Sequence, residues 1–347
     1  MVHDTKPSEV PEDGPDSEGD EPGETEEQRE EIHSRRIDGP DSFLNDPTEL
    51  TDGVYILEEC TINPHLRELK AAQNPQWFKR GHEFHTPINT YLLTGEDEAL
   101  LFDTSSPNVR DAITTGVRAV LEKEDVELSY IVLSHDEAAH VGNAYPISRE
   151  AAMIHPDYQE NADDVYELQQ ELHATLIARK PSRVAPEFHY FDDAKLVDPG
   201  YTIDLGGRTL EFIEPVWQDG APTLWMYDHK DKGLYCVDSY GFPHCSGDCT
   251  KWADELEFRV SQDQMMEYNG RAFRYIPNCN PWKIIDQHNH LHDSYDIDYI
   301  FPAHGQPIRE EIDRYRGLMD SMVERIARDG SLGTEYVSAE ELTDISF

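Results

Sequence analysis

Residues 134–142, which read SHDEAAHVG, place two histidines and an intervening glutamate directly after an apolar run. Imidazole and carboxylate groups are common protein ligands of zinc, iron and manganese. A zinc-protease helix would carry Glu directly after the first His and a second His four residues on, because four residues return a helix to one face. Here His135 and His140 are five residues apart, and Glu137 is the second residue after His135. We therefore interpret the stretch as a metal-binding loop that leaves a strand.

Two further candidate ligands also follow apolar strands. Asp238 comes after GLYCV and His304 after YIFPA, just as His135 comes after YIVLS. Ligands at the carboxyl ends of strands are a common way to build a site in α/β proteins. Alternatively, His304, which precedes a glycine, is structural, and Asp238 caps a turn. Together the three positions predict one metal site, in which the carboxylate of Asp238 suits a bridge between two metal ions.

The elements that must position these ligands follow from hydrophobic periodicity. We expect strands at 52–59, 130–133 and 297–305, and hairpins at 89–104, 202–217 and 223–241, the second with a Gly-Gly turn. We expect helices at 108–124, 162–180 and 307–330, and a mostly helical segment at 251–293. Strand pairs and helices alternate in two similar halves, which predicts sheets flanked by helices.

The composition excludes several classes of partner. The 347 residues carry a formal net charge of -42, which argues against nucleic acid and anionic membranes. The N-terminus is acidic and lacks the apolar stretch of a secretory signal, and no run approaches the ~20 apolar residues of a membrane helix. The five cysteines form no regular framework, which suits a reducing compartment. We therefore expect a cytoplasmic protein.

The acidic residues run through the whole chain and resemble the composition of proteins from salt-in halophiles. Concentrated salt would screen their mutual repulsion. The alternative is an ordinary protein with an acidic tail. Residues 1–47 are rich in Glu, Asp, Pro, Gly and Ser, and we expect a disordered tail there, one domain at 48–330 and a second tail at 331–347.

The residues Ser134, His135, Glu137, His140 and Gly142 resemble the S-H-x-H-x-D-H-x-G motif of the metallo-β-lactamase fold. Glutamate in place of the second histidine resembles the flavodiiron and oxygen-binding diiron branch. Four further segments also resemble this branch: DGVYILEE, NTYLLTGEDEALLFDT, LWMYDHKDKGLYCVDSYG and FPAHG. The resemblance covers roughly residues 50–325. The resemblance implies an α/β (α+β) fold, the αββα four-layer sandwich.

The resemblance also implies a ligand set. His135 and Glu137 would hold one iron, His140 and His304 the other, and Asp238 would bridge them. Two iron ions are expected, with one iron or a zinc ion as alternatives.

The chain departs from the family pattern at two ligand positions. Ala139 stands where the family has an aspartate. After the EP of residues 214–215, Gln218 or Asp219 stands where the family has a histidine, and Asp219 could supply an oxygen ligand. His244 is a candidate substitute ligand, and His82 and His85 are candidates to line the pocket.

The chain also departs in length. Only 43 residues follow His304, too few for the flavodoxin domain of classical flavodiiron proteins. We therefore expect no FMN in this chain and a separate electron-donor protein. The resemblance further implies a homodimer.

Three functions follow from these observations. The first is a non-heme diiron protein, an oxidoreductase or carrier that binds or reduces dioxygen or nitric oxide. The second is a hydrolase, in which a metal lowers the pKa of bound water toward ~7. The third is a scaffold with a degenerate site. Separately, HCSGDC (244–249) with Cys279 and HNHLH (288–292) could form a small zinc site, although packed cysteines would give the same pattern.

Overall fold

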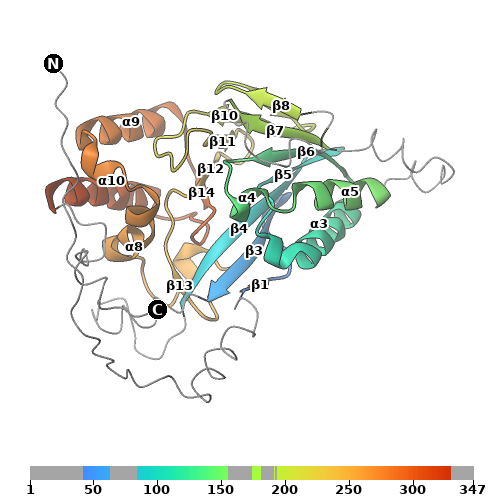
Figure 1. Ribbon diagram of the computed structural model, residues 1–347, viewed down its shortest axis with the longest axis horizontal. Helices are drawn as coiled ribbons and strands as arrows, with labels where there is room; N and C mark the ends of the chain where they lie inside the picture. The colour runs from blue at the N-terminus through green and yellow to red at the C-terminus, as the bar shows by residue number, and fades with distance from the viewer. Residues whose placement is uncertain (1–41, 63–83, 155–173, 181–190, 192–193, 330–347) are drawn as a thin grey trace, which may run out of the picture. The chain divides into compact units, whose positions relative to one another are not determined.

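The computed structural model describes residues 42–62, 84–154, 174–180, 191 and 194–329. The chain divides into two units, Met1–Pro40 and Asp41–Phe347, and the described residues all belong to the second. Among them the strands form two sheets, and helices lie on the outer face of each (Figure 1).

The first sheet has the order β1-β3-β4-β5-β6-β7-β8, with β2 on β3 and β13 on β4. Its strands are β1 (Ser42–Leu44), β2 (Thr48–Thr51), β3 (Val54–Ile62), β4 (Phe84–Thr94), β5 (Glu98–Phe102), β6 (Glu127–Leu133), β7 (Thr175–Arg179), β8 (Ala194–Val197) and β13 (His244–Cys245). Strands β5 to β8 are parallel. The carboxyl ends of β5 and β6 therefore meet at one edge.

The second sheet has the order β14-β12-β11-β10-β9. Its strands are β9 (Thr202–Asp204), β10 (Thr209–Ile213), β11 (Trp225–Asp228), β12 (Gly233–Val237) and β14 (Tyr299–Pro302). The pairing of β12 with β14 is parallel, so both strands deliver their following residues to the same edge. The expected Gly-Gly hairpin joins β9 to β10, and Gly206 and Gly207 both have the positive φ that such turns require.

The main hydrophobic core lies between the two sheets. Tyr91 of β4 packs against Tyr235 of β12 and Phe301 of β14, with 5.4 Å between ring centroids in each pair. The outer face of the first sheet is covered by α3 (Arg110–Glu124) and α5 (Ala144–Ile154), and the second by α8 (Gln262–Ala272), α9 (Pro281–Ser294) and α10 (Ile312–Asp329). The expected four-layer αββα sandwich is confirmed.

Three expected elements differ from the structure. The predicted helix at 162–180 is wrong at its end, because Thr175–Arg179 is strand β7, buried between β6 and β8; residues 162–173 lie outside the described residues. Residues 42–44 of the expected tail form strand β1 on β3. The closing helix begins at Ile312 because Ile308 first makes a bridge to Ile300.

The segment 251–293 is mostly helical, as expected, with α8 and α9 separated by a short 3-10 helix (Ile276–Asn278). None of the helices in the described part of the chain is both long and apolar enough to span a membrane.

Candidate metal centre

The loop after β6 is anchored by an aspartate from the neighbouring strand. Asp103 follows β5 and adopts a positive φ of 65°, a conformation that Asp tolerates better than most residues. Its Oδ1 accepts a hydrogen bond from the Ser134 backbone N–H at 2.8 Å, and its Oδ2 accepts one from Ser134 Oγ at 2.8 Å. Asp103 thereby fixes the start of the segment that carries His135, Glu137 and the short helix α4 (Ala138–Val141).

The three candidate histidines are each held by a partner at the δ nitrogen. His140 Nδ1 donates to Asp103 Oδ2 at 2.9 Å, and His304 Nδ1 donates to the Pro87 carbonyl at 2.7 Å. His135 Nδ1 donates to Ser134 Oγ at 3.0 Å, because that hydroxyl already gives its proton to Asp103. A neutral ring with its proton on Nδ1 presents a lone pair at Nε2. All three rings are therefore oriented as metal ligands usually are.

The ε nitrogens converge on three carboxylates. His135 Nε2 lies 3.1 Å from Asp219 Oδ2 and 3.5 Å from Glu137 Oε2. Asp238 Oδ1 lies 3.4 Å from His140 Nε2 and 3.3 Å from His304 Nε2. We call these six residues the histidine–carboxylate cluster; they are His135, Glu137, His140, Asp219, Asp238 and His304.

Several acceptor atoms of this cluster lack a hydrogen-bond donor within the described part of the chain and would be satisfied by a cation. His135 Nε2 and Asp238 Oδ1 are buried and make no well-formed hydrogen bond among the described residues. His140 Nε2 faces His304 Nε2 at 3.2 Å, which would set two lone pairs against each other. Buried polar atoms without partners are costly, and metal ions commonly satisfy them. The ligand atoms of His135, Glu137, His140 and Asp238 all lie within 4.8 Å of one another, so the donor set fits a metal centre.

The electrostatics of the cluster point the same way. Burial alone would lower the pKa of His135, but the neighbouring carboxylates of Asp219 and Glu137 raise it well above the ordinary histidine range. Burial would raise the pKa of Asp238, but the neighbouring His304, His135 and His140 lower it. The carboxylates therefore impose a negative potential that favours a proton or a metal ion between the rings.

The structure also decides between several sequence candidates. Asp219 reaches the cluster, whereas the Gln218 side chain turns away and donates to Glu214. Ala139 lies in α4 and offers no ligand atom. His244 lies apart from the cluster, against Cys60.

The remaining candidates among the described residues do not line the cluster. His85 lies beside Cys249, and His82 is outside the described residues. The possible zinc site of residues 244–249, Cys279 and 288–292 does not form as one group, in agreement with the alternative of packed cysteines and a polar loop. His288 instead bonds to Tyr240 and Asp320, and Cys279 is exposed.

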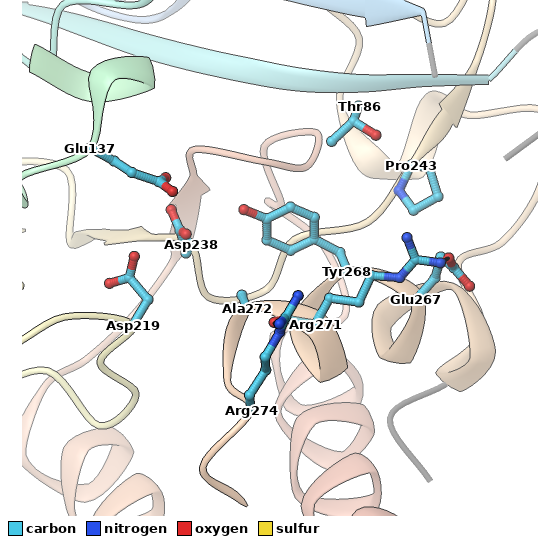
Figure 2. A pocket seen from close by; sticks show the side chains of 10 residues that line it. All are labelled: Thr86, Glu137, Asp219, Asp238, Pro243, Glu267, Tyr268, Arg271, Ala272 and Arg274. Atoms are coloured by element: carbon cyan, nitrogen blue, oxygen red, sulfur yellow. Dashed lines mark hydrogen bonds and ion pairs between the residues drawn. The ribbon is translucent and has the colours of Figure 1, made fainter. Parts of the chain in front are cut away.

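A cleft of ≈ 450 Å³ opens onto the cluster. Figure 2 shows the carboxylates of Glu137, Asp219 and Asp238 on one side of it, with the Tyr268 hydroxyl pointing toward Asp238. The Tyr268 ring stacks on His304, with 4.7 Å between centroids.

Asp103 and Tyr268 are the two site residues that the sequence analysis missed. Asp103 could have been found, because it is an acidic residue directly after an apolar strand, as Asp238 is.

Comparison with known proteins agrees with this geometry. Residues 85–215 match the model of the metallo-beta-lactamase superfamily. A nitric oxide reductase of Moorella thermoacetica is 22% identical over 264 residues, covering 76% of this chain and 57% of that protein. The flavodiiron protein of Giardia intestinalis superimposes with a TM-score of 0.54 at 19% identity, over 82% of this chain and 60% of that one. The rubredoxin oxygen:oxidoreductase of Desulfovibrio gigas superimposes with a TM-score of 0.53 at 18% identity, over 82% of this chain and 61% of that one.

Residues 85–215 of the chain are therefore similar to the metallo-β-lactamase superfamily, and the rest of the fold agrees with that likeness. More particularly, flavodiiron proteins are among its structural neighbours and a nitric oxide reductase is among its relatives, which agrees with the branch that the Glu137 motif predicts. The chain spans about half the length of the curated relatives it matches.

Proposed function

We propose that the histidine–carboxylate cluster binds two iron ions and that the protein binds or reduces dioxygen or nitric oxide, with electrons from a separate protein. The observation that carries this proposal is the convergence of three imidazole ε nitrogens, each fixed through its δ nitrogen, on three carboxylates. The names of the nitric oxide reductase and the oxygen:oxidoreductase among its relatives support the choice of substrates.

The ligands divide naturally between two positions. His135, Glu137 and Asp219 would hold one ion, and His140 and His304 the other. Asp238 would be shared, because its Oδ1 lies 3.3–3.4 Å from the latter two histidines and its carboxylate also lies within 4.8 Å of the ligand atoms of His135 and Glu137. The second position then has two histidines and one carboxylate, the donor set of non-heme iron sites that keep open positions for dioxygen. Iron bound there would supply the electrons that dioxygen or nitric oxide accepts.

The cleft provides groups that act on the substrate side. Burial and the charges of Asp238 and Glu137 raise the pKa of Tyr268 well above its usual value, so the phenol stays protonated at neutral pH. Its hydroxyl points toward Asp238 and is placed to donate a proton or a hydrogen bond to an anionic species in the cleft (Figure 2). Arg271 and Arg274 also line the cleft and favour anions at its mouth.

The setting of the protein is part of the proposal. We propose one domain from about residue 42 to residue 330, without FMN in this chain, in a cytoplasm of high salt concentration. The charge of -42 supports the last point, because concentrated salt screens repulsion between carboxylates. We also propose that the chain forms a homodimer, as the family resemblance implies.

An Asp238→Ala variant tests the ligand assignment. Removing the shared carboxylate should abolish iron binding at both positions together with any spectral response to oxygen. Asp111→Ala, on the exposed side of α3, is the matched control and should keep both. Retention of two iron ions by Asp238→Ala would defeat the assignment, and one zinc ion with ester or thioester cleavage by the unaltered protein would favour the hydrolase instead.

A further inference from the structure

A second cluster of metal-ligand side chains lies apart from the first. Cys60 lies near the end of β3, His85 is the second residue of β4, His244 lies in β13, and Cys249 follows β13 in a turn. Their ligand atoms all lie within 4.8 Å of one another. The register brings them together, since His85 is paired with both Ile62 and His244 across its two neighbouring strands. We call Cys60, His85, His244 and Cys249 the Cys–His cluster.

Two distances in the Cys–His cluster match the sulfur–nitrogen edges of a tetrahedral zinc site, and the sulfur–sulfur distance is shorter than the edge expected for it. Cys60 Sγ lies 3.2 Å from Cys249 Sγ and 3.6 Å from His244 Nε2, and His85 Nδ1 lies 3.3 Å from Cys249 Sγ. Zinc–ligand bonds of about 2.3 Å to sulfur and about 2.0–2.1 Å to nitrogen imply ligand–ligand edges of about 3.3–3.8 Å. The two sulfur atoms are too far apart for a disulfide, whose bond is about 2.05 Å long.

We propose that the Cys–His cluster binds one structural zinc ion through two thiolates and two imidazoles. Two sulfur and two nitrogen donors in a tetrahedral arrangement are the set that zinc prefers, whereas carboxylate-rich sets suit iron and manganese. Cys60, His85 and His244 are buried, so the site is closed to solvent on most sides, as structural zinc sites are. This proposal does not depend on the function proposed for the first cluster.

The Glu58 carboxyl borders the Cys–His cluster, with its Oε1 2.8 Å from Cys60 Sγ and 3.7 Å from His244 Nε2. Two thiolates would balance the charge of the divalent ion.

Gln306 provides support for His244. Its side-chain amide lies 3.1 Å from His244 Nδ1, and its Oε1 is buried without a hydrogen-bond partner. Turning the amide by half a turn would let Oε1 accept the Nδ1 proton and leave Nε2 for the zinc ion.

The position of the Cys–His cluster gives the zinc ion a structural role near the first site. His304 receives its orientation from Pro87, two residues beyond His85, and lies two residues before Gln306. An ion that ties β3, β4, β13 and Cys249 together therefore also fixes the two segments that orient His304. We expect its loss to loosen the first site without removing any of the six residues proposed to hold iron.

Metal analysis of purified protein and of a Cys60→Ser/Cys249→Ser variant tests the proposal. We expect about one zinc per chain in the unaltered protein, lost in the double variant, while Cys279→Ser, at an exposed cysteine, keeps it. Asp238→Ala should lose iron and keep zinc, so failure at one cluster can be told from failure at the other. Equal zinc content in the double variant and the unaltered protein would overturn the proposal.

Two measurements on the unaltered chain serve if the double variant does not fold. Cobalt(II) exchanged into the zinc position should give a thiolate-to-cobalt charge-transfer absorption, which the first cluster cannot give because it has no sulfur ligand. Cys60 and Cys249 should resist alkylation until a chelator removes the metal, whereas Cys279 should react in either state. Absence of that absorption, or a Cys60–Cys249 disulfide in protein purified without oxygen, would contradict the assignment.

Discussion

Asp103→Asn tests whether the orientation of His140 controls metal affinity. Asp103 Oδ2 accepts the proton of His140 Nδ1 at 2.9 Å, while Oδ1 accepts from the Ser134 backbone. An asparagine can keep the bond to Ser134 through its amide oxygen, but its NH₂ group then faces His140 Nδ1. The ring must move its proton to Nε2, the atom that faces His304 and Asp238. A proton there occupies the lone pair that a metal ion would need.

The expected loss of metal affinity can be estimated from other residues that orient a metal-ligating histidine. Loss of the group that orients a metal-ligating histidine weakens metal binding by about 10- to 100-fold. This corresponds to about 1.4–2.8 kcal/mol at the His140–His304 position. The other position, with His135, Glu137 and Asp219, should be affected less, because Asp103 reaches His135 only through Ser134.

The assay is titration with ferrous ion against a competing chelator, without oxygen and in concentrated KCl. Asp111→Asn makes the same chemical change on an exposed surface of α3 and serves as the control. Urea unfolding of metal-free protein separates a loss of stability from a loss of affinity. If Asp103→Asn binds both ions as tightly as the control, the orientation argument for His140 is wrong.

Three further predictions concern the site and the fold. Ala139→Asp should tighten binding of the second iron by restoring a carboxylate, measured by the same titration; unchanged affinity would show that the position does not reach the metal. Arg208 and Asp228 form a fully buried ion pair, so Arg208→Met should lower the free energy of unfolding in urea by about 3–5 kcal/mol, and a loss below about 1 kcal/mol would contradict this. Burial lowers the pKa of His292 to about 3, whereas an unfolded histidine titrates near 6.5. The unfolded chain therefore binds the extra proton, stability should fall as pH falls from about 6.5 toward 3, and His292→Gln should flatten this dependence in urea midpoints.

Most of the fold could be predicted from local patterns. The hairpins at 89–104, 202–217 and 223–241 form as expected, because their apolar strands and polar or glycine turns are adjacent in sequence. Strand β7 was missed because a parallel strand buried on both faces reads as a short apolar run, which periodicity cannot separate from a helix end. Strand β1 was missed because its three residues adjoin an acidic tail and owe their order to pairing with β3.

The candidate metal centre was predictable to the extent that its residues follow strands. His135, Asp238 and His304 each come after an apolar strand, and parallel pairing brings such ends together. The sequence indicated only half of the Cys–His cluster, because the possible zinc-binding segment 244–249 contains His244 and Cys249 but nothing pointed to Cys60 and His85 as their partners. Cys60 and Cys249 are 189 residues apart, and only the three-strand register of β3, β4 and β13 brings them together. Tyr268 was equally hidden, since a half-buried aromatic on α8 looks like an ordinary core residue.

The proposal that the histidine–carboxylate cluster binds two iron ions is tested by the iron content of protein purified without oxygen in concentrated KCl. The absorption spectrum of the same sample is recorded before and after exposure to air. The arrangement of His135, Glu137, His140, Asp219, Asp238 and His304 predicts about two iron ions per chain and a spectral change on exposure to air. Absence of stoichiometric iron in that sample, with no response to air, would contradict the account.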